Sequence, residues 1–369
     1  MSERVKILFA VPRMSVGGAE KLLVQQMRTL NRERFVPTLV TLFTEQEDSL
    51  AASVEIDRCF GFRSTLDIIR LPTLVAYLKR ERFDVVVTHL FSANLLVRIA
   101  AILARVPVIV SYEHNIYPEK RRWQIFMDRF LARWTQVIIT DSKAASRFTA
   151  SQERIPLEKF RTMYIPPLLE GKPRDIRTVR SELGIPEKAR VVLTVSRLVS
   201  DKGHTCLIEA AKSVLTKYPD AVFLLVGWGP LKDPLLSQAR ELGIARSIFL
   251  PGRLDIQDVL PLADVYVDPS VSTDLPIAIM EAMGEGKAIV ATAVGDVPVF
   301  IENGKTGLCV PPRDPHKLAG AIDKLLSDRA LAVRFGEAAK NRVEKYSLSE
   351  YMRVFEKLLL ELYANRTKN

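Results

Sequence analysis

Residues 268–312 read DPSVSTDLPIAIMEAMGEGKAIVATAVGDVPVFIENGKTGLCVPP, and they follow an apolar run at 264–267 that is typical of a buried strand. Pro276 suits the first turn of a helix, and glycines after the helix let the chain leave it. Glu281 therefore lies on a short helix behind a strand-to-helix crossing, and a second buried strand follows at 288–292. Doubly wound α/β sheets bind ligands at such crossings, where unpaired helix N–H groups can meet an anion.

A similar crossing is expected near the start of the chain. Residues 5–11, VKILFAV, form an apolar run of strand length, and the loop PRMSVGG leads into a segment with helical spacing of its apolar residues. Gly17 and Gly18 would let the backbone approach a ligand at the start of that helix. A tight turn is the alternative interpretation of the glycine pair.

Two further strands of the first half end on a histidine. Strands are expected at 36–43, 84–88, 107–111, 136–140 and 160–165. His89 follows the second of them and His114 lies just beyond the third. Because parallel sheets hold functional groups at the carboxyl ends of their strands, either histidine is a candidate site residue. Otherwise each one hydrogen-bonds within its own loop.

The segment 119–134 combines aromatic and basic residues, EKRRWQIFMDRFLARW. As a helix it suits an anionic interface such as a membrane surface. The alternative is an ordinary packing helix whose arginines are solvated or whose aromatic residues belong to the core.

The second half begins after Pro166 and Pro167, which make the best domain boundary. A buried strand is expected at 190–196, and Arg197 and Lys202 lie on the loop behind it. Two cations on one short loop suit a diphosphate, because they neutralise the charge that grows on a phosphate leaving group. Surface solvation of both side chains is the alternative.

Composition limits the class of protein. The chain has 369 residues and 48% hydrophobic residues, enough for a large core and for two domains. Its charge is +10, from 53 Lys and Arg against 43 Asp and Glu; residues 1–166 hold 25 and 17 of these, which is +8. The basic first half predicts an anionic partner, for which a membrane surface, a pyrophosphate-linked lipid and nucleic acid are candidates, although no nucleic-acid motif is found.

The three cysteines, Cys59, Cys206 and Cys309, are isolated and odd in number, so we expect reduced, mostly buried thiols and no metal site. No apolar run approaches the roughly 20 residues that span a bilayer. The N-terminus enters a strand without a signal peptide. These features predict a cytoplasmic protein, or one attached peripherally to the cytoplasmic face of a membrane.

Several motifs together resemble the retaining glycosyltransferases of family 4, also called glycosyl transferases group 1. The matching stretches are Glu281-Ala282-Met283, Val290-Ala291-Thr292, Asn303-Gly304, the R-x-x-x-x-K-G of 197–203 and the G-x-G-P of 227–230. The family's first glutamate, eight residues before Glu281, is replaced by Thr273, and Asp274 stands where the family usually has glycine. The resemblance covers nearly the whole chain, most specifically residues 190–312.

Alternating strands and helices with two glycine-bearing crossings predict an α/β chain of two doubly wound Rossmann-like domains. The resemblance implies the GT-B fold, in which two such domains face a central cleft. We expect an acceptor-side domain at 1–166, a nucleotide-sugar domain at 167–349, and a C-terminal helix, 350–369, that returns to the first domain.

The resemblance further implies a glycosyltransferase of the bacterial polysaccharide or lipid-linked glycan type. It would move a hexosyl or N-acetylhexosaminyl group from a UDP- or GDP-sugar to a glycan or lipid-linked acceptor. The transfer would retain the anomeric configuration and need no metal or other cofactor. Glu281 would hold the ribose, Arg197 and Lys202 the diphosphate, and His114 the sugar. The implied donor site consists of Gly17, Gly18, Arg197, Lys202, Gly229, Arg253, Thr273, Asp274, Leu275, Pro276, Ile277 and Glu281, and the implied catalytic residues are His114, Arg197 and Lys202. The alternatives are a nucleotide-sugar-binding scaffold without turnover and a GT-B epimerase.

Overall fold

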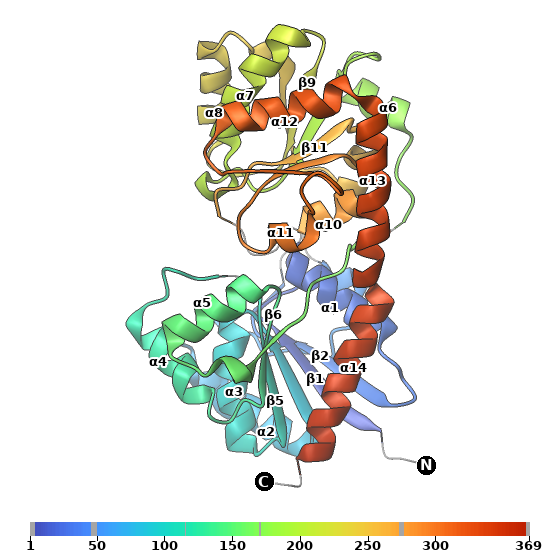
Figure 1. The fold of residues 1–369 in the computed structure, drawn as a ribbon. Helices are drawn as coiled ribbons and strands as arrows, with labels where there is room; N and C mark the ends of the chain where they lie inside the picture. Colours follow the sequence, from blue (N-terminus) through green and yellow to red (C-terminus); the bar gives the residue numbers. More distant parts are fainter. Residues whose placement is uncertain (1–3, 46–49, 115, 170, 273–276, 367–369) are drawn as a thin grey trace. The chain divides into compact units, whose positions relative to one another are not determined.

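The computed structural model describes residues 4–45, 50–114, 116–169, 171–272 and 277–366. The chain forms two compact units (Figure 1). The first consists of Met1–Ile165 together with Leu348–Asn369, and the second is Pro166–Ser347. Each is an α/β unit with its own parallel sheet.

The sheet of the first unit has seven strands in the order β3-β2-β1-β4-β5-β6-β7, all parallel. Their bounds are β1 Val5–Val11, β2 Phe35–Thr41, β3 Arg58–Cys59, β4 Val85–His89, β5 Val108–Glu113, β6 Val137–Thr140 and β7 Phe160–Thr162. The order reverses between β1 and β4, so the loops that follow these two strands lie at the switch point where such sheets bind ligands.

Helices cover both faces of this sheet: α1 Gly18–Thr29, α2 Leu71–Glu81, α3 Leu90–Ala104, α4 Arg122–Leu131, α5 Lys143–Glu153 and α14 Leu348–Asn365. Figure 1 shows α1 and α14 on one face, with α2 and α3 on the other. The C-terminal helix α14 packs Phe355 against Phe9 of β1, with 6.3 Å between ring centroids. Its Tyr351 hydroxyl accepts a hydrogen bond from the Gln26 amide of α1.

The second unit has six parallel strands in the order β10-β9-β8-β11-β12-β13. They are β8 Val191–Val195, β9 Val222–Val226, β10 Ile248–Gly252, β11 Val265–Asp268, β12 Ile289–Thr292 and β13 Leu308–Val310. Its helices are α6 Ile176–Glu182, α7 His204–Lys217, α8 Lys232–Glu241, α9 Ile256–Val259, α10 Ile277–Gly284, α11 Val297–Phe300, α12 Pro315–Ser327 and α13 Arg329–Val343. Here the switch point lies between β8 and β11.

The apolar runs of the strands become buried because parallel sheets are covered on both faces. In β9 all five residues of VFLLV are buried. The core of the second unit joins its central strands to α7 and α12, and that of the first joins β1, β2 and β4 to α2 and α3.

Most elements lie where the sequence predicts them. Asp314 caps α12, because its carboxylate accepts a hydrogen bond from the Lys317 amide at 2.9 Å. The strand expected at 160–165 is only the three-residue β7, and the short strands β3 and β13 were not predicted. None of the helices within the described ranges is long and apolar enough to cross a membrane.

The expectation of mostly buried thiols is wrong. All three cysteines are free, but Cys59 is exposed and the other two are only partly buried. Cys59 lies on β3, a two-residue strand at the edge of the sheet, and both residues of this strand are exposed. As an edge strand, β3 has a neighbouring strand, β2, on one side only.

Two helix glycines should respond oppositely to alanine. A Cβ at Gly336 of α13 would lie 1.9 Å from the Gly286 carbonyl oxygen, whereas a Cβ at Gly320 of α12 would meet nothing within 4 Å. We expect Gly336→Ala to lower the free energy of unfolding by about 2–3 kcal/mol through overpacking. Gly320→Ala should raise it by up to about 1 kcal/mol, because alanine favours the helix. Urea unfolding measures both, and a shift of the same sign in both variants would contradict this packing.

Candidate functional site

Among the residues that the structure describes, the switch point of the second unit carries Arg197, Lys202, Ile277 and Glu281 of the predicted donor site. Arg197 and Lys202 follow β8, and the loop that begins at Asp268 follows β11, the next strand in the sheet. The amides of Val271 and Ser272 both donate to the Asp201 carbonyl, at 2.8 and 3.2 Å. The two loops are therefore joined through their main chains.

This joint requires glycine at position 203. Gly203 has a φ of +66°, and a Cβ there would lie 1.9 Å from the Pro269 carbonyl oxygen. Any side chain would push the two loops apart. The K-G pair found in the sequence thus has a packing reason beside any role in ligand binding.

The loop that follows β9 packs against the loop that follows β8. A Cβ at Gly227 would lie 1.8 Å from the Ser196 carbonyl oxygen, and one at Gly229 would lie 2.4 Å from that of Leu198. The Leu198 amide in turn donates to the Trp228 carbonyl at 2.8 Å. Gly229, predicted to bind the donor, is thus required by backbone packing behind Arg197.

The two cations differ in environment. Arg197 is exposed. The Lys202 side chain is only 17% exposed, and its Nζ lies 3.9 Å from Asp201 Oδ2, at the outer limit of an ion pair. Arg253, also predicted to bind the donor, is exposed on the loop after β10.

Glu281 is buried on α10, with 5% of its surface exposed. Behind it lies Tyr266 of β11, which is fully buried. Burial raises the pKa of Tyr266 well above its ordinary value, and the carboxylates of Asp268 and Glu281 raise it further. Ile277 is the first residue of α10, whereas the predicted donor residues Thr273, Asp274, Leu275 and Pro276 lie outside the described residues.

Sequence reasoning missed His204, the first residue of α7. It is 1% exposed, and its Nε2 lies 3.0 Å from Ser196 Oγ. Burial, and after it the Lys202 ammonium, lower its pKa to about 4. The imidazole is therefore neutral at physiological pH and braces the loop that carries both cations. Its place two residues after Lys202 in the sequence was an available signal.

In the first unit the predicted glycine pair begins α1. Gly17 is at the N-cap position and Gly18 is the first helical residue. A Cβ at Gly17 would lie 2.6 Å from a carboxylate oxygen of the buried Glu20, which accepts a hydrogen bond from Ser15 Oγ at 2.5 Å. The glycine at position 17 therefore lets the Glu20 carboxylate approach the backbone closely.

The two candidate histidines of the first unit are in direct contact. His89 Nδ1 lies 2.9 Å from His114 Nε2, and His114 Nδ1 lies 3.1 Å from Asp141 Oδ2. Each of the three side chains is buried, His89 completely. Asp141 was not singled out in the sequence, although it directly follows β6 as the histidines end or follow β4 and β5.

The basic and aromatic segment forms α4 with its aromatic side chains outward. Trp123, Phe126, Phe130 and Trp134 are 38, 65, 39 and 42% exposed. They are not core residues, which removes one of the alternatives for this helix. The arginines at 121, 122, 129 and 133 are exposed as well.

A buried charge cluster holds the inner side of α4. Arg98 of α3 donates to Asp128 of α4 at 3.2 Å, and the Lys120 ammonium lies 2.9 Å from Asp128 and 2.6 Å from Glu153. Burial, and after it the Asp128 carboxylate, raise the pKa of Glu153 to about 8. Burial alone would lower the pKa of Lys120, but the surrounding carboxylates, Glu113 first, raise it. The cluster fixes α4 by ion pairs and so leaves its apolar side chains free to face outward.

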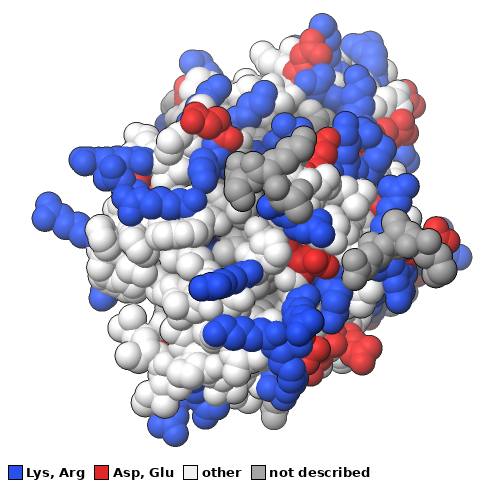
Figure 2. Space-filling model, turned by 90° about the horizontal axis from the view of Figure 1, so that it is seen from below, with Lys and Arg blue, Asp and Glu red and all other residues white. Residues whose placement is uncertain are grey.

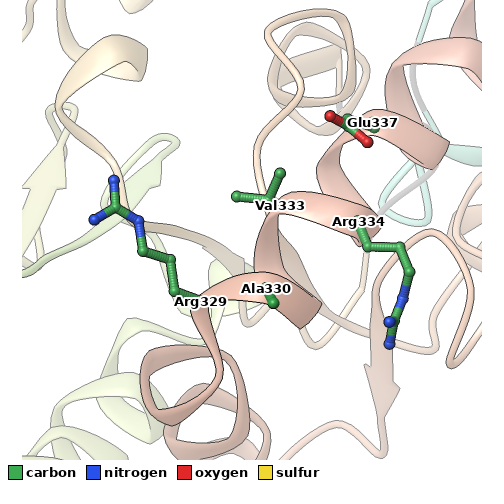
Figure 3. A pocket seen from close by; sticks show the side chains of 5 residues that line it. All are labelled: Arg329, Ala330, Val333, Arg334 and Glu337. Carbon is green, nitrogen blue, oxygen red and sulfur yellow. The ribbon is translucent and has the colours of Figure 1, made fainter.

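A shallow hollow on α13 is a separate feature (Figure 3). It is lined by Arg329, Ala330, Val333, Arg334 and Glu337, all from this one helix. None of these belongs to the predicted donor site.

Both halves of the chain match glycosyltransferase family models. Residues 16–165, in the first unit, match Glycosyltransferase Family 4, and residues 175–342, in the second, match Glycosyl transferases group 1. The chain is 23% identical over 385 residues to the UDP-Gal:alpha-D-GlcNAc-diphosphoundecaprenol alpha-1,3-galactosyltransferase of Escherichia coli, with 98% of each chain covered. It is 34% identical over 203 residues to the D-inositol 3-phosphate glycosyltransferase of Corynebacterium urealyticum, covering 52% of this chain and 47% of that one.

Solved structures share the fold. The Anabaena protein HepE in complex with UDP-glucose has a TM-score of 0.83, with 23% identity over 97% of this chain and 100% of that one. A glycosyltransferase from Rickettsia africae has a TM-score of 0.81, with 19% identity and full coverage of both chains. The fold is therefore GT-B, as the resemblance implied.

Acid should destabilise the second unit through His204. The unfolded chain takes up a proton at the ordinary pKa of 6.5, whereas the folded chain does so only at about 4. Between pH 6.5 and 4 the chain takes up a proton on His204 when it unfolds. Each pH unit of acidification in this range therefore lowers the free energy of unfolding by up to about 1.4 kcal/mol. We expect His204→Gln to reduce that slope in urea titrations from pH 7 to 4.5. The exposed His316→Gln is the control, and an unchanged slope in His204→Gln would refute the assignment.

Proposed function

Because this chain belongs to the GT-B glycosyltransferases of family 4 and group 1, we propose that it transfers a sugar from a UDP-sugar to a lipid-linked or other glycan acceptor. The observation that carries the proposal is the position of Arg197, Lys202 and Glu281 around the β8–β11 switch point, within the span that matches the group 1 model. The lipid-linked acceptor is supported by the Escherichia coli relative. UDP is supported by the name of that relative and by the HepE complexes.

In this proposal the second unit binds the nucleotide. The Glu281 carboxylate accepts hydrogen bonds from the ribose hydroxyls, while the Arg197 guanidinium and Lys202 ammonium bind the diphosphate. Two loops joined at Asp201 hold these cations in place before the ligand arrives. Such preorganised charge stabilises the UDP leaving group as the sugar bond breaks.

We propose further that a hexosyl or N-acetylhexosaminyl group is transferred with retention and without a metal ion. The bond from the anomeric carbon to the phosphate oxygen breaks, and a bond to the acceptor oxygen forms on the same face of the sugar. The acceptor proton passes to the departing phosphate. The protein contributes positioning and electrostatic stabilisation, with His114 on the sugar side.

A thermal-shift panel of UDP-, GDP- and ADP-sugars, combined with an assay for released nucleotide, tests the proposal. We expect UDP-sugars alone to raise the unfolding midpoint, with or without EDTA. Arg197→Ala should weaken UDP binding about tenfold to a hundredfold, because a charge-assisted hydrogen bond is lost. Arg246→Ala, also exposed in the second unit, is the matched control. A shift without release of nucleotide to any acceptor would favour a binding scaffold, and conversion of the free nucleotide sugar would favour an epimerase.

We also propose that α4 binds an anionic membrane surface on the side where the lipid-linked acceptor resides. Its aromatic side chains face outward between arginines, and the Lys120 cluster holds the helix from behind. On the face seen in Figure 2, Lys and Arg side chains outnumber Asp and Glu side chains around broad uncharged areas. Basic side chains near an anionic surface contribute about 1 kcal/mol each.

Removing three arginines, Arg121, Arg122 and Arg129, by substitution with Gln should weaken binding to phosphatidylglycerol-containing vesicles about a hundredfold. The matched control substitutes three exposed arginines of the second unit, Arg177, Arg240 and Arg246. Vesicle flotation measures both variants at two salt concentrations. Equal partitioning of both triple variants would remove the membrane role of α4.

A further inference from the structure

Trp228 is exposed at the carboxyl edge of the second sheet. It lies in the turn that directly follows β9, and 63% of its surface is exposed. Among the large hydrophobic side chains that the structure describes in the second unit, Ile176 and Val333 are also exposed, at 42 and 51%. These two lie on the helices α6 and α13, whereas Trp228 lies at the edge where parallel sheets bind ligands.

The backbone of this turn is held from both sides. The Trp228 carbonyl accepts a hydrogen bond from the Leu198 amide at 2.8 Å, and the Gly227 amide donates to the Gly252 carbonyl at 2.8 Å. A Cβ at Gly227 or Gly229 would collide with a carbonyl oxygen of the β8 loop. Position 228 is therefore the one position of this three-residue turn that can carry a side chain, and a fixed backbone presents its indole.

The turn lies between two loops that carry cations. In the sheet β9 is flanked by β10 and β8, and the loops after these strands carry the exposed Arg253 and Arg197. Lys202 follows on the β8 loop. Because neighbouring strands are about 5 Å apart, the three loops lie side by side. An indole flanked by cationic side chains suits a ligand that is both aromatic and anionic.

We propose that Trp228 is a stacking platform for the nucleobase of a nucleoside diphosphate whose phosphates bind Arg197 and Lys202. This inference rests on the proposed function, which assigns side chains to the ribose and the diphosphate and none to the base. The face of the indole contacts the face of the base, and every base can make this contact because each has a π face. Stacking on Trp228 therefore raises the affinity for the nucleotide without selecting one base.

Isothermal titration calorimetry of the full chain with UDP and with inorganic pyrophosphate tests the stacking. We expect Trp228→Ala to bind UDP about tenfold more weakly than the wild type, and Trp228→Phe to keep most of the affinity, since its ring still stacks. Pyrophosphate has no base, so Trp228→Ala should bind it as the wild type does. Val333→Ala, which truncates another exposed apolar side chain of the second unit, is the matched control. Unchanged UDP affinity in Trp228→Ala, or an equal loss for pyrophosphate, would overturn the proposal.

Tryptophan fluorescence gives a second readout, in which the Trp228 side chain stays in place. The chain has three tryptophans, so replacing Trp123 and Trp134 by Phe leaves Trp228 as the single emitting indole. We expect UDP to change the emission of Trp228 and pyrophosphate to leave it unchanged, because only the base contacts the ring. The same emission with and without saturating UDP would contradict the stacking.

The outcomes separate this inference from the proposed function. If UDP binding depends on Trp228 but no UDP-sugar is turned over, the transfer proposal fails and the stacking stands. If Trp228→Ala lowers the affinity for a UDP-sugar but not for UDP, the indole contacts the sugar, and the assignment to the base is overturned. If the wild type binds none of UDP, GDP and ADP, both proposals are overturned.

Discussion

The hydrogen bonds from the Val271 and Ser272 amides to the Asp201 carbonyl connect two loops that come from neighbouring strands. Arg197 and Lys202, which are predicted to bind the diphosphate, lie on the loop after β8. The loop after β11 leads to α10, which carries Glu281. Gly203 lets the loops meet, and Gly227 and Gly229 support the first loop from behind. Because the joint is made of main-chain atoms, the geometry of the predicted donor site depends on the absence of side chains at these three positions.

In the first unit, buried ion pairs add to apolar packing on the inner side of α4. Arg98, Lys120 and three carboxylates lie buried together between α3, α4 and α5. Removing one partner of such a cluster leaves an uncompensated buried charge. The ion pairs therefore favour this one position of α4, even where their net contribution to stability is small. The cluster gives α4 a polar inner side, and this explains how a helix rich in aromatic residues can keep them exposed.

The sequence alone predicts most of the fold, because apolar runs of strand length alternate with helical periodicity. It also predicts Arg197, Lys202 and Glu281 as site residues, since each follows a strand end that is visible as a local pattern. Asp141 could not be predicted as the partner of His114, because that pairing depends on which strands are neighbours in the sheet. The exposure of Cys59 could not be predicted, because β3 has only two residues and gives no periodic signal. His204 was missed although it follows Gly203 directly, since a lone histidine at a helix start does not reveal its burial.

The return of α14 to the first unit has a consequence for synthesis of the chain. The helix supplies Tyr351 and Phe355 to the core around Phe9, yet it is translated only after the whole second unit. At about 5–20 residues per second, translation of residues 166–347 leaves the part of the first sheet that α14 covers without this helix for roughly 10 to 40 seconds. The unit that begins at the N-terminus is thus the last to be completed, and during this interval on the ribosome it presents an apolar surface to chaperones.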